Sequence, residues 1–160
     1  MPGKVSVLNQ STLRGVRSVI KSPDGVMLSC CLSEPNEIPT ACGTLVPRWG
    51  PEDERSRPRP ALSFYPDGSL RSIYLQQMTT VTTPIGPYPA ELLIFYPEGT
   101  LQRLFPLNGQ LSGFWELKDE QRLCPQLSFH LFCGSFKAKM IGLHFFASGA
   151  LRSLTLWPGE

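Results

Sequence analysis

LLIFYPEGTLQRLFPLNGQLSGFW, residues 92–115, indicates the fold of the chain more clearly than any other segment. Its first apolar run ends at residues 97–99 (PEG), and its second apolar run ends at residues 107–109 (LNG). A two-residue reversal between twisted strands needs positive φ, which glycine adopts freely, so Gly99 and Gly109 each indicate a β-hairpin. The stretch therefore predicts two successive hairpins.

The same cycle of apolar run, turn and apolar run recurs in the rest of the chain. FYPDGSLRSI at residues 64–73 aligns with FYPEGTLQRL at residues 95–104 and with FFASGALRSL at residues 145–154. A weaker copy of the turn lies at residues 22–28, SPDGVML. Repeats that cannot bury an apolar face alone stack on their neighbours, so the copies predict hairpins that pack side by side.

Strand periodicity predicts which side chains of each copy are buried. Neighbouring residues of a strand point to opposite faces of the sheet. One aromatic residue of each pair should therefore face the packed side, opposite the leucine that follows the turn, and the other aromatic should lie on the second face. The leucines are Leu70, Leu101 and Leu151. The second-face aromatics form a stripe that either packs against another layer or is available to a partner.

The chain as a whole is predicted to be all-β, with repeated antiparallel β-hairpins that form an extended twisted sheet or a partly closed meander. We expect a single β-repeat domain over residues 1–160, with the clearest repeats at residues 62–158, because the length suits one domain. Residues 50–60, GPEDERSRPRP, contain three prolines, six charged residues and no aliphatic residue. Such a segment indicates an exposed loop or hinge.

The remaining segments give less specific predictions. A strand is expected at residues 4–8, whereas the apolar residues at 13–20 fit either a strand or a short helix. The other expectations are a strand running into a loop at residues 78–89, a turn of helix or a loop at 115–125, one strand at 126–140, and a last hairpin at 141–146 and 151–157.

Composition favours a packed core and gives little sign of nucleic-acid binding. Hydrophobic residues make up 41% of the chain and charged residues 18%, whereas disordered chains combine low hydrophobicity with high net charge. The net charge is +2, and ten of the fifteen basic residues are arginines scattered along the sequence. Nucleic-acid affinity comes mainly from clustered Lys and Arg, so we expect no nucleic acid among the partners.

Several features predict a cytoplasmic protein. No run reaches the ~18 apolar residues that a membrane span needs, and residues 1–9 lack the apolar segment typical of a secretory signal. Five cysteines are an odd number, which suits free thiols in a reducing compartment better than a disulfide framework. Peripheral lipid contact is a further option.

The Phe-Tyr-Pro-(Asp/Glu)-Gly cycles and the segment LNGQLSGFW at residues 107–115 resemble the variant MORN repeat of bacterial proteins, some of which are labelled antitoxin-like. The resemblance covers residues 62–158, with degenerate and irregularly spaced copies. In that family each unit is a β-hairpin, and the units stack into a long twisted sheet used for protein or lipid contacts. The resemblance implies no catalytic residue. It implies turn and packing roles for Gly68, Gly99, Gly109, Gly113, Gly149, Tyr65, Tyr96 and Phe146.

The reactive side chains lack the spacing of known catalytic or metal-binding motifs. Structural zinc and iron–sulfur sites use Cys-x2-Cys pairs, which the chain lacks. His130 and His144 lie in strand-like sequence without an acidic residue at a telling spacing, and no nucleophile elbow or phosphate-binding loop occurs. We therefore expect no catalytic residue, cofactor or metal. The alternative is a small metal- or thiol-dependent redox factor or enzyme that uses Cys30, Cys31 and Cys42.

The sequence thus favours a non-enzymatic β-hairpin repeat module that binds another protein. Exposed aromatic residues beside arginine are typical of binding hot spots, and arginine suits carboxylate and phosphate groups. The candidate partner-binding residues are Tyr65, Tyr96, Arg71, Arg103 and Arg152. Open sheets leave unpaired edges, so we also consider a homodimer formed through the sheet edges.

Overall fold

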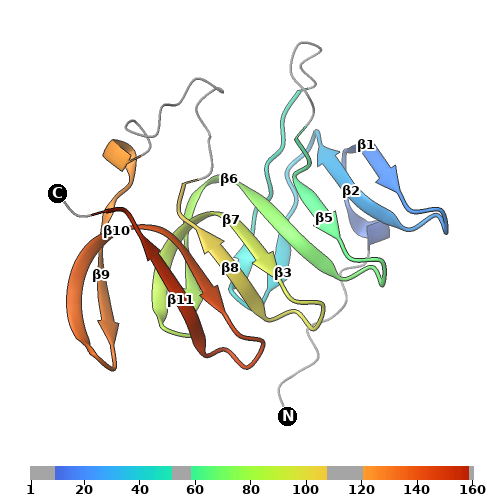
Figure 1. The fold of residues 1–160 in the computed structure, drawn as a ribbon. Coiled ribbons are helices and arrows are strands. Elements are labelled where there is room, and N and C mark those ends of the chain that lie inside the picture. Colours follow the sequence, from blue (N-terminus) through green and yellow to red (C-terminus); the bar gives the residue numbers. More distant parts are fainter. Residues whose placement is uncertain (1–9, 52–58, 108–120, 159–160) are drawn as a thin grey trace.

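The fold is a large antiparallel sheet with a small hairpin beside it. The computed structural model describes residues 10–51, 59–107 and 121–158. Within these ranges, nine strands form one sheet in the order β1-β2-β5-β6-β7-β8-β10-β11, with β9 paired to β10, while β3 and β4 pair with each other. The bounds are β1 (Val16–Lys21), β2 (Met27–Leu32), β3 (Ile38–Thr40), β4 (Gly43–Leu45), β5 (Leu62–Phe64), β6 (Leu70–Thr83), β7 (Gly86–Phe95), β8 (Leu101–Phe105), β9 (Gln126–Leu131), β10 (Gly134–Phe145) and β11 (Leu151–Leu156). The all-β prediction is confirmed, and the sheet is open, because β1 and β11 lie at its opposite ends (Figure 1).

Four hairpins of the sheet have the same type of turn. At the β5–β6 turn, the amide of Tyr65 donates to the carbonyl of Ser69, and the amide of Gly68 donates to the carbonyl of Tyr65, both at 2.9 Å. Gly68 has a φ of +87°, which glycine adopts without steric cost. The turns that contain Gly25, Gly99 and Gly149 have the same pair of hydrogen bonds. The weaker copy predicted at residues 22–28 is therefore confirmed.

These turns are one residue longer than the sequence predicted. The two hydrogen bonds enclose the three residues 66–68, rather than a two-residue reversal. Three-residue loops of this kind place glycine at a bulge after the turn, and the register between β5 and β6 shifts at this point. The sequence correctly predicted a positive φ at the turn glycine, but the loop has three residues instead of two.

The four hairpins are neighbours in the sheet, in the order β1–β2, β5–β6, β7–β8 and β10–β11. Their turns lie along one side of the molecule (Figure 1). In the three clearest copies, one aromatic is buried and pairs with the leucine after the turn, as the strand periodicity predicted, and in each copy it is the first aromatic. These pairs are Phe64 with Leu70, Phe95 with Leu101, and Phe145 with Leu151.

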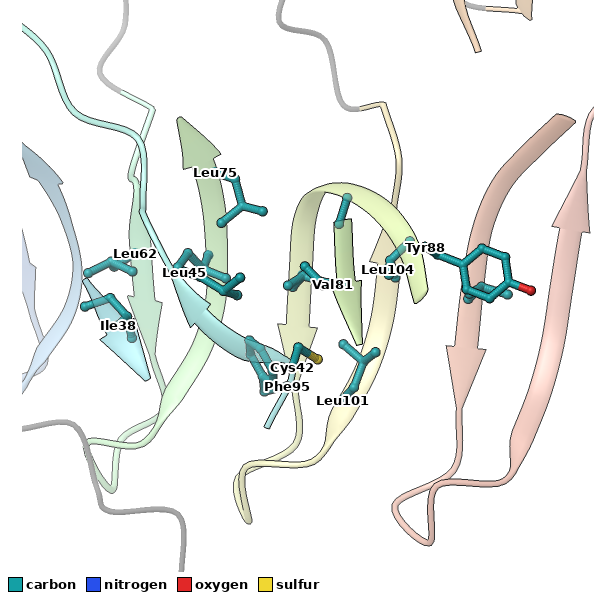
Figure 2. Packing of buried hydrophobic residues seen from close by; sticks show 14 of the residues in the cluster. Ile38, Cys42, Leu45, Leu62, Leu75, Val81, Tyr88, Phe95, Leu101 and Leu104 are labelled. Carbon is teal, nitrogen blue, oxygen red and sulfur yellow. The ribbon is translucent and has the colours of Figure 1, made fainter. Parts of the chain in front are cut away.

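The hydrophobic core lies on one face of this sheet. A buried row of apolar side chains crosses five strands at matched register and consists of Leu62, Ile73, Leu93, Leu104 and Leu143. The β3–β4 hairpin lies over this face, and its Ile38, Cys42 and Leu45 belong to the same buried cluster (Figure 2). The core is thus enclosed between the sheet and a covering layer.

The far ends of two longer hairpins complete that covering layer. β6 and β7 continue past a register irregularity and curve over the core, where Val81 and Tyr88 are buried (Figure 2). The ring of Tyr88 stacks on Phe129 of β9 with centroids 5.3 Å apart, and its hydroxyl donates to the carbonyl of Ser128 at 3.3 Å. These contacts hold the β6–β7 end against the β9–β10 hairpin.

Two segments reverse direction where the sequence predicted something else. Residues 126–140 form the β9–β10 hairpin instead of one strand, with a turn at residues 132–133. Residues 78–89 pass through a short turn into β7 instead of running into a loop. Gly134 and Gly86 have φ values of +133° and +118° and directly follow the two turns, where positive φ permits the reversal.

The remaining expectations have mixed outcomes. A 3-10 turn, η1 (Gln10–Thr12), precedes strand β1, so residues 13–20 contain a strand and not a helix. Residues 121–123 form a helical turn, one of the two alternatives predicted for that stretch. The strand predicted at 4–8, the turns at Gly109 and Gly113, and most of the loop at 50–60 lie outside the described residues.

Candidate functional site

The two candidate tyrosines form hydrogen bonds with the backbone of neighbouring hairpins. The hydroxyl of Tyr65 donates to the carbonyl of Phe95, and the hydroxyl of Tyr96 donates to the carbonyl of Phe145, both at 2.7 Å. Burial raises the pKa of Tyr65. Each tyrosine therefore joins its hairpin to the next one. Phe146 occupies the same position in the last copy and is 48% exposed. Because it lacks a hydroxyl group, it cannot form the equivalent hydrogen bond to a further hairpin.

Two of the candidate arginines lie over these aromatic residues. The guanidinium carbon of Arg71 is 5.8 Å from the ring centroid of Tyr65, and that of Arg152 is 5.5 Å from the ring centroid of Phe146. Both arginines are exposed and occupy the bulged position after the paired leucine. The repeat thus presents an arginine on an aromatic ring at both places, a favourable cation–π arrangement.

The third candidate arginine lies next to a histidine. Arg103 of β8 is directly opposite His144 of β10, and His144 is also opposite Ser153 of β11. Burial, then Arg103 and then Arg152, lower the pKa of His144. The Nε2 atom of His144 is inaccessible to solvent and has no hydrogen-bond partner among the described residues. The structure thus brings Arg103 and Arg152 together around His144, whereas Arg71 lies beside Tyr65.

The cysteines of the alternative prediction are buried thiols. Cys30 and Cys42 belong to the core cluster, and burial raises the pKa of each from 9.0 to about 11. The Sγ atom of Cys31 donates to the carbonyl of Arg59 at 3.4 Å. In the described ranges, no three His, Cys, Asp or Glu side chains are grouped closely enough to hold a metal ion. Because a thiolate is the reactive form, this geometry gives the redox alternative no support.

Among the described residues, the most exposed apolar side chain is one that the sequence did not single out. Phe132 lies at the tip of the β9–β10 hairpin and is 106% exposed. Phe136, on the next strand, stacks on the buried ring of Phe129 with centroids 5.2 Å apart. The prediction of one strand over residues 126–140 leaves no place for a turn at this position. Gly134, two residues after Phe132, is the sequence signal that could have revealed the turn.

One edge of the sheet has a feature that opposes edge-to-edge pairing. β1 contains Ser18 with a φ of +50° and pairs with β2 with two register irregularities. Bulges of this kind, and charged residues such as Lys21 at the end of the strand, are used by natural sheets to prevent pairing between edges. A homodimer through the edges stays a prediction.

Comparisons of the chain with protein-family models, with curated proteins and with solved structures find no significant match. The resemblance to MORN repeats therefore stays a prediction. In the part of the chain that the structure describes, no helix has the length and apolar character needed to span a membrane.

Proposed function

We propose that this protein is a non-enzymatic β-hairpin repeat module that binds another protein, and that the tip of the β9–β10 hairpin is its main contact. The exposure of Phe132 carries this proposal. A phenylalanine that is 106% exposed has its whole side chain in water, and burying it in an apolar pocket gains about 1.5–3 kcal/mol. Aromatic residues that fill a pocket on the partner are typical anchors of protein interfaces.

The hairpin that carries Phe132 is firmly held. β9 and β10 pair at six consecutive positions without irregularity, from Leu131 with Gly134 to Gln126 with Lys139. Below the tip, the stack of Tyr88, Phe129 and Phe136 fixes the hairpin to the covering layer of the core. A preorganised anchor loses less conformational entropy on binding than a flexible one.

Polar side chains surround the aromatic tip. Nδ1 of His130 and the hydroxyl of Ser135 are hydrogen-bonded at 2.8 Å, and Lys137 is exposed on β10. An apolar centre with a polar rim is the usual arrangement of a protein interface. The resemblance to MORN repeats, whose stacked hairpins serve as contact surfaces, supports the same proposal by analogy.

We also propose a cytoplasmic location. All five cysteines are free thiols, as is usual in a reducing compartment. A fractionation experiment with a tagged protein tests this point, and recovery from an oxidising compartment contradicts it.

The experiment that tests protein binding is quantitative affinity purification of the tagged protein from its own cells. Phe132→Ser should lose the specific partner that the unmodified chain captures in stoichiometric amount. Phe146→Ser is the matched control, because Phe146 is also an exposed phenylalanine at a hairpin turn. Capture of the same partner by Phe132→Ser, or no specific partner with the unmodified chain, contradicts the proposal.

A further inference from the structure

The face of the sheet opposite the core brings three basic side chains together. Arg103, His144 and Arg152 come from the adjacent strands β8, β10 and β11. Arg103 and His144 are register partners, and opposite residues of an antiparallel pair have Cβ atoms about 4.5–5.5 Å apart on the same face. Arg152 is near enough to act on the imidazole. The three side chains thus form one cluster, the Arg103–His144–Arg152 cluster.

The cluster has unused hydrogen-bonding capacity. The Nε2 atom of His144 is shielded from solvent and has no hydrogen-bond partner in the part of the chain that the structure describes, although buried polar groups in proteins are nearly always paired. Among the residues that the structure describes, Arg103 and Arg152 form no ion pair or hydrogen bond through their side chains. The two guanidinium groups have no counter-charge within the described residues, so they produce a positive potential that attracts an anion.

The position of Arg152 suits the binding of an oxyanion. Its guanidinium lies over the ring of Phe146 at 5.5 Å, and the ring limits the conformations that the side chain can adopt. Arginine presents planar donors that match carboxylate and phosphate oxygens. The hydroxyl of Ser153, the other register partner of His144, adds a further donor beside the cluster.

We propose that Arg103, His144 and Arg152 bind a single oxyanionic group, either a carboxylate or a phosphate. Its oxygens accept hydrogen bonds from the two guanidinium groups, and its negative charge lies beside the imidazole. The site belongs to β8, β10 and β11 and does not depend on protein binding at the β9–β10 tip. It also gives a functional role to two of the five residues that the sequence singled out.

The test is an NMR titration of the imidazole signals, because the chain has only two histidines and His130 serves as an internal reference. The probes are inorganic phosphate and acetate, each compared with sodium chloride at equal ionic strength. An anion held beside His144 should raise its pKa by about one pH unit or more, since a nearby opposite charge favours the protonated imidazole. A response to acetate indicates a carboxylate ligand, and a response to phosphate alone indicates a phosphate ligand.

Matched variants separate the site from general screening. Arg103→Gln and Arg152→Gln should each raise the pKa of His144 without added anion and remove most of the response to it. Arg71→Gln is the control, because Arg71 occupies the repeat position of Arg152 on another hairpin and should leave the response unchanged. The proposal is overturned if neither probe moves the His144 signal more than chloride does, or if Arg71→Gln weakens the response as much as Arg103→Gln.

Discussion

The hydroxyl of Tyr65 donates a hydrogen bond of 2.7 Å to the carbonyl of Phe95, 30 positions further along the chain. Tyr96 makes the equivalent bond to Phe145, 49 positions further along. The unequal separations explain how irregularly spaced copies still form a regular structure. Each tyrosine bonds to the next hairpin in space, whatever length of chain lies between the two hairpins.

The first prediction concerns these two bonds. Tyr65→Phe and Tyr96→Phe should each lower the free energy of unfolding by about 1 kcal/mol, because each removes one hydrogen bond between hairpins. Urea unfolding followed by tryptophan fluorescence measures the change. Tyr74→Phe is the control, since the hydroxyl of Tyr74 forms no hydrogen bond with any residue that the structure describes. Its loss of unfolding free energy should be near zero. Equal effects of all three variants would show that the bonds contribute nothing specific.

The second prediction concerns the shared turn. Gly68→Ala should cost about 1 kcal/mol or more, because φ is +87° and an alanine is strained there. Apart from Gly68 and its two chain neighbours, no described residue has a heavy atom within 4 Å of the added methyl group, so the cost comes from the backbone conformation. Gly50→Ala is the control, as Gly50 also has open space and is not among the glycines with positive φ. Equal thermal midpoints for the two variants would disprove the turn assignment.

The third prediction concerns thiol reactivity. Cys133 is the one exposed cysteine, and the other four are buried. A chromogenic disulfide reagent should therefore modify one thiol rapidly in the native protein and all five after unfolding, because buried thiols react only when the structure opens. Cys133→Ser should abolish the rapid phase. A second thiol that reacts at the rate of Cys133 would show that the packing around the cysteines is looser than described.

The fourth prediction concerns alkaline pH. Burial raises the pKa of Cys30 and Cys42 from 9.0 to about 11. Below pH 9 both thiols are protonated in the folded and the unfolded protein, so the free energy of unfolding does not depend on their titration there. Between pH 9 and 11 only the unfolded chain releases these protons. The free energy of unfolding should then fall by up to about 1.4 kcal/mol per pH unit for each thiol.

Urea unfolding at a series of pH values measures this slope. Cys42→Ala should reduce the alkaline slope, whereas Cys133→Ser, which changes an exposed thiol, should leave it unchanged. The comparison uses slopes, so a lower overall stability of Cys42→Ala does not affect it. An unchanged slope in Cys42→Ala would mean that this thiol titrates in the same pH range in both states.

The parts of the fold that depend on local chemistry could be predicted from the sequence. Glycine turns and strand alternation are local properties, and they correctly located the shared turns and predicted one buried aromatic in each copy. The structure shows that these aromatics are Phe64, Phe95 and Phe145. The β9–β10 reversal also has a local signal that was not used. Apolar residues of β9 occupy odd positions up to Leu131, and those at the start of β10 occupy even positions from Phe136 to Met140. That change of parity marks the two-residue turn.

The candidate site depended on information that no local pattern contains. Arg103 and His144 are opposite each other because β8 and β10 are neighbours in a particular register, and a shift of one residue would place them on different faces. The hydrogen bonds of Tyr65 and Tyr96 depend on the same non-local alignment. The sequence identified the arginines and tyrosines as candidate residues. It could not indicate that the tyrosines form hydrogen bonds with other hairpins of the chain, or that two of the arginines lie beside a histidine.

Photo-crosslinking in living cells tests whether the β9–β10 tip binds another protein. The photo-reactive residue benzoylphenylalanine replaces Phe132 in one variant and Phe146 in the control, so both probes are exposed aromatic residues at hairpin turns. We predict a discrete crosslinked product of higher mass from position 132 and none from position 146. Equal crosslinking from both positions, or none from position 132, would contradict the claim.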